Sequence, residues 1–267
     1  MLVVCATPIG NLEDVTLRVL RELREADVVL CEDTRHTRRL LEAHGIRTRT
    51  LSYHEHNEAA RTASLLPRLR AGERVALVSD AGMPAISDPG GRLVAAALGA
   101  DVDVTVAPGP SAVETALVAS GLVSDGYAFI GFLPRGGAAL ARVWARLASA
   151  EWPTVAFESP RRLPATLRSL ADAGPSRTVA VCRELTKRHE EVVRGTAAEV
   201  SAHFDAPPKG EVTLVIAGGG AERDADIDDA AAAVGELVAA GVTRRQAVDV
   251  VSRLTSLPRK RLYDVSL

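Results

Sequence analysis

The sequence predicts an α/β protein with two α/β domains and a small helical unit at its carboxyl end. Short apolar runs alternate with amphipathic stretches from the first residues onward, which is typical of a mostly parallel sheet. Several of these runs end in a turn rich in Gly, Pro and Asp. Aromatic residues make up only 3% of the 267 residues, so the core must be built from Val, Leu and Ala. This composition favours α/β packing over an aromatic-rich β sandwich.

The first half alternates strand and helix. The apolar runs predict strands at residues 2–6, 28–31, 48–51, 75–78 and 102–106. Helices are expected in the intervals, at residues 15–23, 37–43, 58–69 and 91–98, with a glycine closing each of the last three. A further helix is expected to begin at Ser111, where Glu114 three residues later predicts a capping box, and to end before Gly121.

The second half contains a second set of strands and helices. Strands are expected at residues 127–132, 154–158, 178–183, 191–194 and 212–217, and helices at 138–149, 164–173 and 197–204. The later strands lie close together in the chain, so antiparallel pairing is expected at one side of this sheet. The boundary is expected near residues 107–122, which divides the chain into an N-terminal α/β domain at 1–110 and a C-terminal α/β domain at 111–220.

A helical unit is expected at residues 224–267, after a linker that begins with three glycines at 218–220. Helices are predicted at 227–239, 243–252 and 257–265. The acidic run at 224–229 resembles the start of an EF-hand loop but lacks Gly at the sixth position and Glu at the twelfth, which indicates a solvated helix entry. Residues 241–267 hold six basic and two acidic residues, and helix-turn-helix spacing with a positive face favours contact with phosphates. The alternative is a packing or dimerisation appendage.

Several classes of protein are disfavoured by missing motifs. The chain has no Gly-rich nucleotide fingerprint, no P-loop, no H-E-x-x-H zinc motif and no G-x-S-x-G elbow. His54-Glu55-His56 does not predict a metal site, because adjacent side chains on a chain point apart. Cys5, Cys31 and Cys182 fall inside predicted strands without CxxC spacing, as expected for reduced core residues of a cytoplasmic protein.

The charge balance and the apolar runs exclude further classes. The formal net charge of −2 excludes a uniformly basic surface, so any contact with nucleic acid must come from local clusters of arginine. Pro8 and Gly10 end the first apolar run early, so we expect a first strand there rather than a signal peptide. No apolar run approaches the length of a membrane span, and no membrane association is expected.

Loops rich in small residues follow four predicted strands, at residues 7–11, 79–84, 108–111 and 133–137. Ligands gather at the carboxyl ends of parallel strands, so these loops predict a pocket for a sizeable small molecule. In the loop at 79–91, Asp80 follows a strand and could accept hydrogen bonds from ribose hydroxyls. The same residues also fit an ordinary turn with capping aspartates. Charged groups at 32–35 and 183–187 also follow strands and are expected where the two domains face each other.

Seven motifs in order resemble the ribosomal RNA small subunit methyltransferase I branch of the tetrapyrrole methylase superfamily. They are Thr-Pro-Ile-Gly-Asn-Leu at 7–12, Glu-Asp-Thr-Arg at 32–35, Ser-Asp-Ala-Gly at 79–82, Pro-Gly-Pro at 108–110, Gly-Phe-Leu-Pro at 131–134, Phe-Glu-Ser-Pro-Arg-Arg at 157–162 and Arg-Glu-Leu-Thr-Lys at 183–187. The resemblance covers residues 1–218, and the C-terminal unit resembles the helix-turn-helix extension of the same branch.

The resemblance implies S-adenosylmethionine as cofactor, bound in an active-site cleft between the two α/β domains, and it implies a homodimer. The implied reaction is 2′-O-methylation of a cytidine ribose in the decoding region of small-subunit (16S) ribosomal RNA, either free or in the 30S particle. From their positions at strand ends, we expect the cofactor pocket to be formed by Pro8, Gly10, Asp80, Gly82, Pro84, Gly109, Ser111, Ala112, Phe132 and Leu133. The candidates for the chemical step are Glu184, Asp33, Arg35, His36 and Lys187, with Glu184 and Asp33 considered as the base and Arg35 and Lys187 as ligands for phosphate.

Two other functions remain open on sequence grounds. The first is methylation of a porphyrinoid carbon. Two features argue against it: the chain lacks a clear set of basic residues for binding a macrocycle, and it carries the terminal helical unit. The second is a non-catalytic, nucleotide-sensing protein that binds DNA through the helical unit. The charged motifs at 32–35 and 183–187 argue against this second function.

Overall fold

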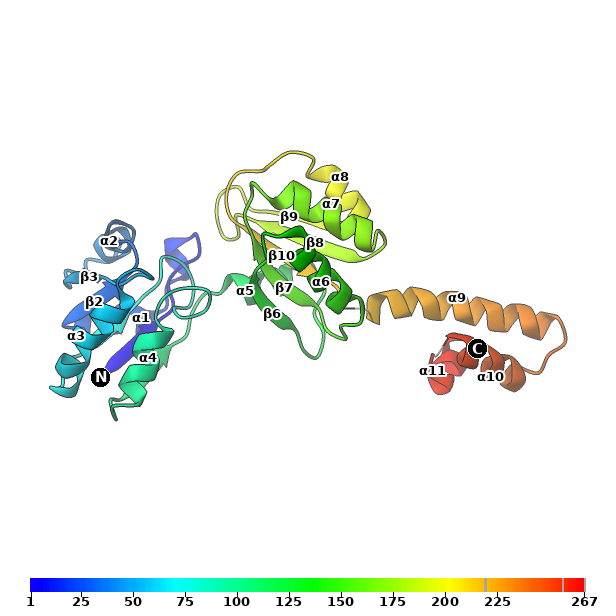
Figure 1. Cartoon of the computed structure of the whole chain (residues 1–267), viewed down its shortest axis with the longest axis horizontal. Helices are drawn as coiled ribbons and strands as arrows, with labels where there is room; N and C mark the ends of the chain where they lie inside the picture. The colour runs from blue at the N-terminus through cyan, green and yellow to red at the C-terminus, as the bar shows by residue number, and fades with distance from the viewer. Residues whose placement is uncertain (219, 256, 267) are drawn as a thin grey trace.

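The computed structural model describes residues 1–218, 220–255 and 257–266, and for residues 220–226 only the helical backbone. Two α/β lobes lie next to each other, and a long helix leads from the second lobe to a small helical unit (Figure 1). The fold class expected from the sequence is confirmed.

The first lobe is a parallel sheet of five strands with helices on both faces. Its strand order is β3 (Thr50–Ser52), β2 (Val28–Cys31), β4 (Val75–Leu77), β1 (Leu2–Cys5), β5 (Val104–Ala107). Side chains of α1 (Leu17–Glu25) and α2 (Thr34–Ala43) pack into the core on one face. Side chains of α3 (Glu58–Arg70) and α4 (Gly91–Leu98) pack on the other face. The neighbours β1 and β4 are therefore followed by helices on opposite faces, and such a switch point opens a crevice at the carboxyl end of the sheet.

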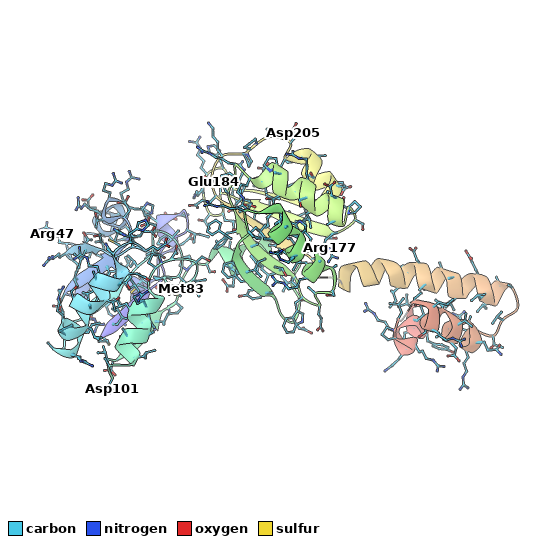
Figure 2. All side chains as sticks on the ribbon, in the orientation of Figure 1. Arg47, Met83, Asp101, Arg177, Glu184 and Asp205 are labelled. Carbon is cyan, nitrogen blue, oxygen red and sulfur yellow. The ribbon has the colours of Figure 1, made fainter. Side chains whose placement is uncertain are left out.

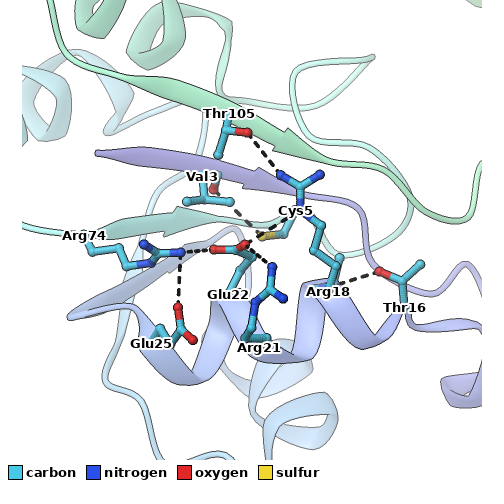
Figure 3. A network of polar contacts seen from close by, with 10 residues as sticks. Val3, Cys5, Thr16, Arg18, Arg21, Glu22, Glu25, Arg74 and Thr105 are labelled. Carbon is cyan, nitrogen blue, oxygen red and sulfur yellow. Dashed lines mark hydrogen bonds and ion pairs between the residues drawn. The ribbon is translucent and has the colours of Figure 1, made fainter.

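At the amino edge of this sheet, a buried carboxylate ties α1 to the strands. Glu22 is 4% exposed and pairs with Arg74, which directly precedes β4, and Arg21 contacts its Oε1 at 3.4 Å. Burial raises the pKa of Glu22, but the hydrogen bonds and charges of Arg74 and Arg21 together outweigh burial, and the pKa is lowered. Arg18 extends the network to Thr105 on β5 at 3.2 Å (Figure 3). Removing one partner of such a buried pair typically costs about 3–5 kcal/mol, so this edge stabilises the fold.

The second lobe contains a mixed sheet. Its order is β6 (Ala128–Phe132), β7 (Thr154–Glu158), β10 (Val212–Ile216), β8 (Thr178–Arg183), β9 (Glu191–Thr196), and only β6 and β7 are parallel. Helices α6 (Gly137–Ala148), α7 (Leu163–Ala173) and α8 (Ala197–His203) cover one face. Helix α5 (Ala112–Ser120) covers the other, together with Ile9 from the first lobe. The expected antiparallel pairing is confirmed, and it runs along both sides of β10.

The capping box expected at Ser111 and Glu114 is wrong. The Ser111 side chain makes no capping hydrogen bond to the backbone of α5, and the Glu114 carboxylate instead accepts a hydrogen bond from the Tyr127 hydroxyl at 2.6 Å. The capping box of this lobe is at the start of α8, where Thr196 and Glu199 satisfy each other's backbone N–H groups. Tyr127 directly precedes β6, and its tertiary contact with Glu114 on α5 overrides the local motif.

The C-terminal unit consists of α9 (Gly220–Ala239), α10 (Arg244–Thr255) and α11 (Arg259–Val265). Ile227, Val234, Val248, Val251 and Leu262 form its core, which is separate from the cores of the two lobes. Helix α9 begins at Gly220, so the acidic run at 224–229 lies inside a helix and not at its entry. The side chains of this run through residue 226, and Gly219 of the expected linker, lie outside the described residues.

The three cysteines are buried and free, as expected. Burial is the main reason that the pKa of the Cys5 thiol is raised to about 12 and that of Cys182 to about 11, so both thiols stay protonated. Within the described ranges, none of the helices combines the length and the apolar character that a membrane span requires.

Candidate active site

The loops after β1, β2, β4 and β5 meet at the carboxyl edge of the first sheet, because parallel strands all end at the same edge. Thr7 and Gly82, from the loops after β1 and β4, exchange two backbone hydrogen bonds of 2.9 and 3.0 Å. Thr7 also donates its hydroxyl to the carbonyl of Ser79 at 3.0 Å. These bonds fix both loops beside the crevice at the switch point. Gly82 has a φ of 75°, a conformation that favours glycine.

The second lobe turns its own loops toward this edge. They are the ends of β6, β7 and β8 and the start of β10. Because β10 runs antiparallel to β7 and β8, its first residues lie at the edge where β7 and β8 end. This geometry brings Gly210 and Glu211 next to Glu184, whose carboxylate accepts a hydrogen bond from the Glu211 N–H at 3.0 Å.

Two adjoining cavities lie between the lobes, each about 420 Å³ in volume. Ile9, Ala81 and Glu211 line both cavities. The first, the polar cavity, is also lined by Thr7, Pro8, Gly10, His36, Arg39, Ser79, Asp80 and Lys187. The second, the apolar cavity, is also lined by Gly82, Met83, Ile86, Asp88, Ser111, Ala112, Phe132, Phe157 and Thr213. One cavity therefore offers cations and the other aromatic and apolar surface.

Lys187 sits in the wall of the polar cavity and is held by two carboxylates. Its Nζ lies 2.8 Å from Glu184 Oε1 and 2.8 Å from Glu211 Oε2. The hydrogen bond from Lys187 holds the pKa of Glu184 below its usual value. Burial lowers the pKa of Lys187, but its hydrogen bonds to Glu184 and Glu211 outweigh burial and the pKa is raised. The Lys187 ammonium and the Glu184 carboxylate are therefore charged at neutral pH (Figure 2 labels Glu184).

Two glycines make room for this group. A Cβ on Gly10 would collide with Lys187 Cγ and lie 2.9 Å from both the carbonyl oxygen of Leu185 and the hydroxyl of Thr186. A Cβ on Gly210 would collide with the Glu184 side chain. Gly10 belongs to the first lobe and Lys187 to the second, so the close approach at Gly10 is a contact between the lobes.

Asp33 and Arg35 form an exposed pair at the start of α2. Asp33 caps the helix by accepting the Arg35 N–H at 2.8 Å, and its Oδ2 lies 2.9 Å from Arg35 Nη2. The hydrogen bond from the Arg35 side chain lowers the pKa of Asp33 to about 2. The Asp33 N–H in turn donates to Asp80 Oδ1 at 3.1 Å, which links the loops after β2 and β4.

Three carboxylates gather beside the apolar cavity. Burial, followed by the charges of Glu32 and Asp80, raises the pKa of Asp88 to about 6. Burial and the charge of Asp80 also raise the pKa of Glu32. These groups add negative potential to one wall of the cavity. Within the part of the chain that the structure describes, no group of three or more His, Cys, Asp and Glu side chains is placed to hold a metal ion.

Most of the expected site residues lie at the cavities. Pro8, Gly10, Asp80, His36 and Lys187 line the polar cavity, and Gly82, Ser111, Ala112 and Phe132 line the apolar one. Glu184, Asp33 and Arg35 line neither cavity, but Glu184 holds Lys187 and Asp33 joins Asp80. Pro84, Gly109 and Leu133 also line neither, and the Leu133 side chain belongs to the core of the second lobe.

Sequence reasoning did not assign Glu211, Asp88 or Phe157 to the site. Glu211 precedes a strand, and only the antiparallel course of β10 brings it to the cavities. The sequence did carry a signal for Asp88, which lies in the loop at 79–91, and for Phe157, which opens the motif at 157–162.

The comparison with protein families matches the model of tetrapyrrole (corrin/porphyrin) methylases to residues 1–201. Curated relatives named ribosomal RNA small subunit methyltransferase I align along most of the chain. The Synechocystis protein is 44% identical over 271 residues, covering 100% of this chain and 97% of the relative. The Mycobacterium bovis protein is 46% identical, covering 98% and 93%. The Thermotoga maritima protein is 44% identical over 218 residues, which span 81% of this chain and 98% of that relative.

Solved structures show the same fold at low sequence identity. Uroporphyrin-III C-methyltransferase from Thermus thermophilus, crystallised with S-adenyl homocysteine, is 23% identical with a TM-score of 0.56, and the match covers 81% of this chain and 96% of that one. The methyltransferase CobJ is 18% identical with a TM-score of 0.62, covering 81% and 93%. At these identities the likeness concerns the fold alone.

Proposed function

The chain belongs to the ribosomal RNA small subunit methyltransferase I family of the tetrapyrrole methylases, and from this membership we propose that it methylates the 2′-oxygen of a cytidine ribose in the decoding region of 16S ribosomal RNA. S-adenosylmethionine is the methyl donor. The observation that carries the proposal is 44% identity to such an enzyme along 100% of this chain. The substrate is a site in the small subunit, either as free RNA or in the 30S particle.

The apolar cavity suits the cofactor. Phe132 and Phe157 provide a face on which an adenine ring can pack, and their rings lie 5.5 Å apart. The carboxylates of Asp88, Asp80 and Glu32 supply negative potential for a ligand that carries a sulfonium and an ammonium group. A volume of about 420 Å³ falls within the range of cofactor pockets, roughly 300–1,000 Å³. Bound there, S-adenosylmethionine supplies an activated methyl group.

We assign ten residues to cofactor binding on the basis of the loops they occupy. Gly82, Ser111, Ala112 and Phe132 line the apolar cavity, and Pro8, Gly10 and Asp80 extend the surface across the shared wall at Ile9 and Ala81. Pro84, Gly109 and Leu133 support these loops from behind. Leu133 donates its N–H to the carbonyl of Phe157 at 3.1 Å, which joins the ends of the two strands that carry Phe132 and Phe157.

The polar cavity suits the target nucleotide. Arg39 and Lys187 line it beside His36, and these two cations would hold the phosphates that flank the ribose. Because the two cavities share the wall formed by Ile9, Ala81 and Glu211, a ribose here faces the cofactor cavity. Alignment of two reactants in this way can account for about 7–11 kcal/mol of a reaction barrier.

His36 is the group that we propose as general base. Asp33 and Glu184 are each engaged with a cation, and the resulting hydrogen bonds lower the pKa of both carboxyls, which weakens them as proton acceptors. In this assignment, Glu184 positions Lys187, and the Lys187 ammonium stabilises negative charge that develops on the 2′-oxygen. Asp33 holds Arg35 and donates its N–H to Asp80, which lines the polar cavity.

Single-turnover rates separate these roles. If His36 is the base, His36→Ala lowers the methyl-transfer rate by about 10²–10⁴-fold, while Asp33→Asn keeps most of the wild-type rate. Glu184→Gln lowers the rate by releasing Lys187, and its fold-loss should match that of Lys187→Met. Retention of the wild-type rate by His36→Ala would remove it as the base.

Three further features belong to the proposal. The helical unit at 224–267 contacts RNA through its basic residues, the protein acts as a homodimer, and it works in the cytoplasm. The support for RNA contact is the excess of basic residues in 241–267. Sedimentation of the purified protein measures the oligomeric state.

The function is tested by incubating the enzyme with methyl-labelled S-adenosylmethionine and three substrates. These are 30S particles from cells that lack the gene, protein-free 16S RNA and uroporphyrinogen. We expect label in RNA, in one nucleoside that mass spectrometry identifies as 2′-O-methylcytidine. Label in the porphyrinogen alone would replace the proposed function with C-methylation, and label in none of the three would reject it.

A further inference from the structure

We propose that four arginines on α2 and on the α2–β3 loop form a docking surface for the RNA strand that flanks the target nucleotide. The four are Arg38, Arg39, Arg47 and Arg49, and we call them the arginine track. The inference rests on the proposed function, because it names the surface by which that RNA substrate is held.

The track is a local excess of charge in a chain that is nearly neutral. The formal net charge of the whole chain is −2, yet residues 35–49 hold five arginines and one acidic residue, Glu42. All four arginines of the track are exposed. Within the part of the chain that the structure describes, none of the four donates a side-chain hydrogen bond or forms an ion pair. Their guanidinium groups are therefore free to bind an anionic partner.

The fold does not require these arginines. Helix α2 packs on the sheet through Thr37, Leu40 and Leu41, which are buried. In the loop, Ile46 is buried, and its N–H bonds to the carbonyl of Leu41 at 2.8 Å. Arg38 and Arg39 do not belong to this buried set, and all four arginines are exposed, so any polar residue would serve the fold at these positions. Their like charges repel each other, and a bound anion would relieve this repulsion.

The track leads away from the catalytic edge. Helix α2 begins at the end of β2, and Arg39 lines the polar cavity. Arg38 is one position earlier, about 100° around the helix. It lines an open depression of about 420 Å³ together with Arg47 and Arg49. Arg47 lies at the outer side of the first lobe, away from Glu184 (Figure 2). The positive surface thus continues from the cavity that would hold the target ribose to the far side of the lobe.

The chemistry of the track fits a phosphate backbone. Guanidinium groups bind phosphate oxygens in a bidentate manner, and a row of them recognises spaced phosphates without reading sequence. The ten residues of α2 span about 15 Å, which is the length of several nucleotides of one strand. The C-terminal helical unit, in contrast, stands apart from the lobes (Figure 1). The track is therefore placed to hold nucleotides next to the target, where contacts position the ribose.

The test is a triple variant, Arg38→Gln/Arg47→Gln/Arg49→Gln, which leaves Arg39 in the cavity. A matched control, Arg70→Gln/Arg146→Gln/Arg168→Gln, removes the same charge from three exposed arginines on α3, α6 and α7. Helix α3 lies on the other face of the first sheet, and α6 and α7 belong to the second lobe. A third variant, Arg38→Lys/Arg47→Lys/Arg49→Lys, keeps the charge. Affinity for 16S RNA and methyl-transfer kinetics are measured from 50 to 300 mM salt.

We expect the Gln triple to raise KM for RNA at least tenfold, with kcat within about twofold of the wild-type value. The slope of log affinity against log salt concentration should decrease in magnitude by about two to three, roughly one for each lost phosphate contact. The Lys triple should retain most of the affinity and the control all of it. Calorimetry with S-adenosylmethionine should give the wild-type affinity for every variant, which shows that the site is folded.

The proposal is overturned if the Gln triple and the control have the same KM and salt slope. It is also overturned if the Lys triple loses as much affinity as the Gln triple, because the effect would then not be one of charge. Failure of the proposed function has a different signature, since wild-type protein would then transfer no methyl group to RNA at any salt concentration.

Discussion

Substitution of Gly10 by alanine tests whether the two lobes meet as described. The added Cβ would collide with Lys187 Cγ and lie 2.9 Å from the Leu185 carbonyl oxygen and from the Thr186 hydroxyl. The Lys187 side chain can rotate away, but the Leu185 carbonyl is backbone, so the loop after β8 must move. Overpacking of this kind typically costs about 1–3 kcal/mol. If that strain is relieved by separating the loops, Lys187 leaves the polar cavity and kcat/KM for methyl transfer falls by about 5- to 150-fold.

The matched control is Gly137→Ala at the first position of α6, where an added Cβ meets no atom within 4 Å. This control should keep the wild-type rate and stability, or gain up to about 1 kcal/mol from the loss of a helical glycine. Steady-state kinetics and thermal denaturation of both variants give the comparison. Wild-type kinetics for Gly10→Ala, alongside an unchanged melting temperature, would refute the close approach of Gly10 to the loop that carries Lys187.

Three further changes have defined outcomes. The pKa of Asp88 is raised to about 6, so ionisation of this carboxyl opposes folding. The stability that the protonated Asp88 carboxyl provides is therefore present below about pH 4 and is lost as the pH rises through 6. Asp88→Asn should therefore raise the free energy of unfolding at pH 8 by about 1 kcal/mol, with no gain at pH 4. The same variant should bind the cofactor more weakly. Equal denaturant midpoints for variant and wild type at pH 8 would contradict the stability prediction. Asp80→Ala should weaken the binding of S-adenosylmethionine at least tenfold in calorimetry, and an unchanged affinity would remove Asp80 from the pocket. A chain that ends at Gly218 should bind the cofactor normally but bind RNA more weakly and with a smaller salt dependence, whereas equal RNA affinity would exclude RNA contact by the helical unit.

The strands were predictable where burial on both faces makes a continuous apolar run. The ranges expected for β2, β7 and β8 match the structure residue for residue. The third strand was less well placed, because polar residues flank its short apolar centre at Leu51 and only pairing with β2 defines its limits at Thr50–Ser52. The capping box failed for a related reason, since the partner of Glu114 is Tyr127, whose approach depends on tertiary packing.

The site was predictable to the extent that its residues follow parallel strands. His36 and Asp80 could be found in this way, because a parallel sheet gathers all of its strand ends at one edge. Glu211 could not, since it precedes β10 and reaches the cavities only because that strand runs antiparallel to its neighbours. The ion pairs of Asp33 and Glu184 were also hidden, and they shift the assignment of the base toward His36.

Backbone strain in this chain is concentrated at the proposed site. Among the described residues, five non-glycine residues have positive φ, and Ala85, Ser87, Glu184 and Thr186 lie in loops at the cavities. Such conformations cost of order 1–3 kcal/mol each and persist only where other contacts fix them. The loop after β8 has those contacts: Glu184 is bound by Lys187 and by the Glu211 N–H, and the Thr186 N–H donates to Glu190 at 2.6 Å. These contacts therefore hold Lys187 in the polar cavity before any ligand arrives, and a preorganised cation is worth more to a developing oxyanion than one that must first be ordered.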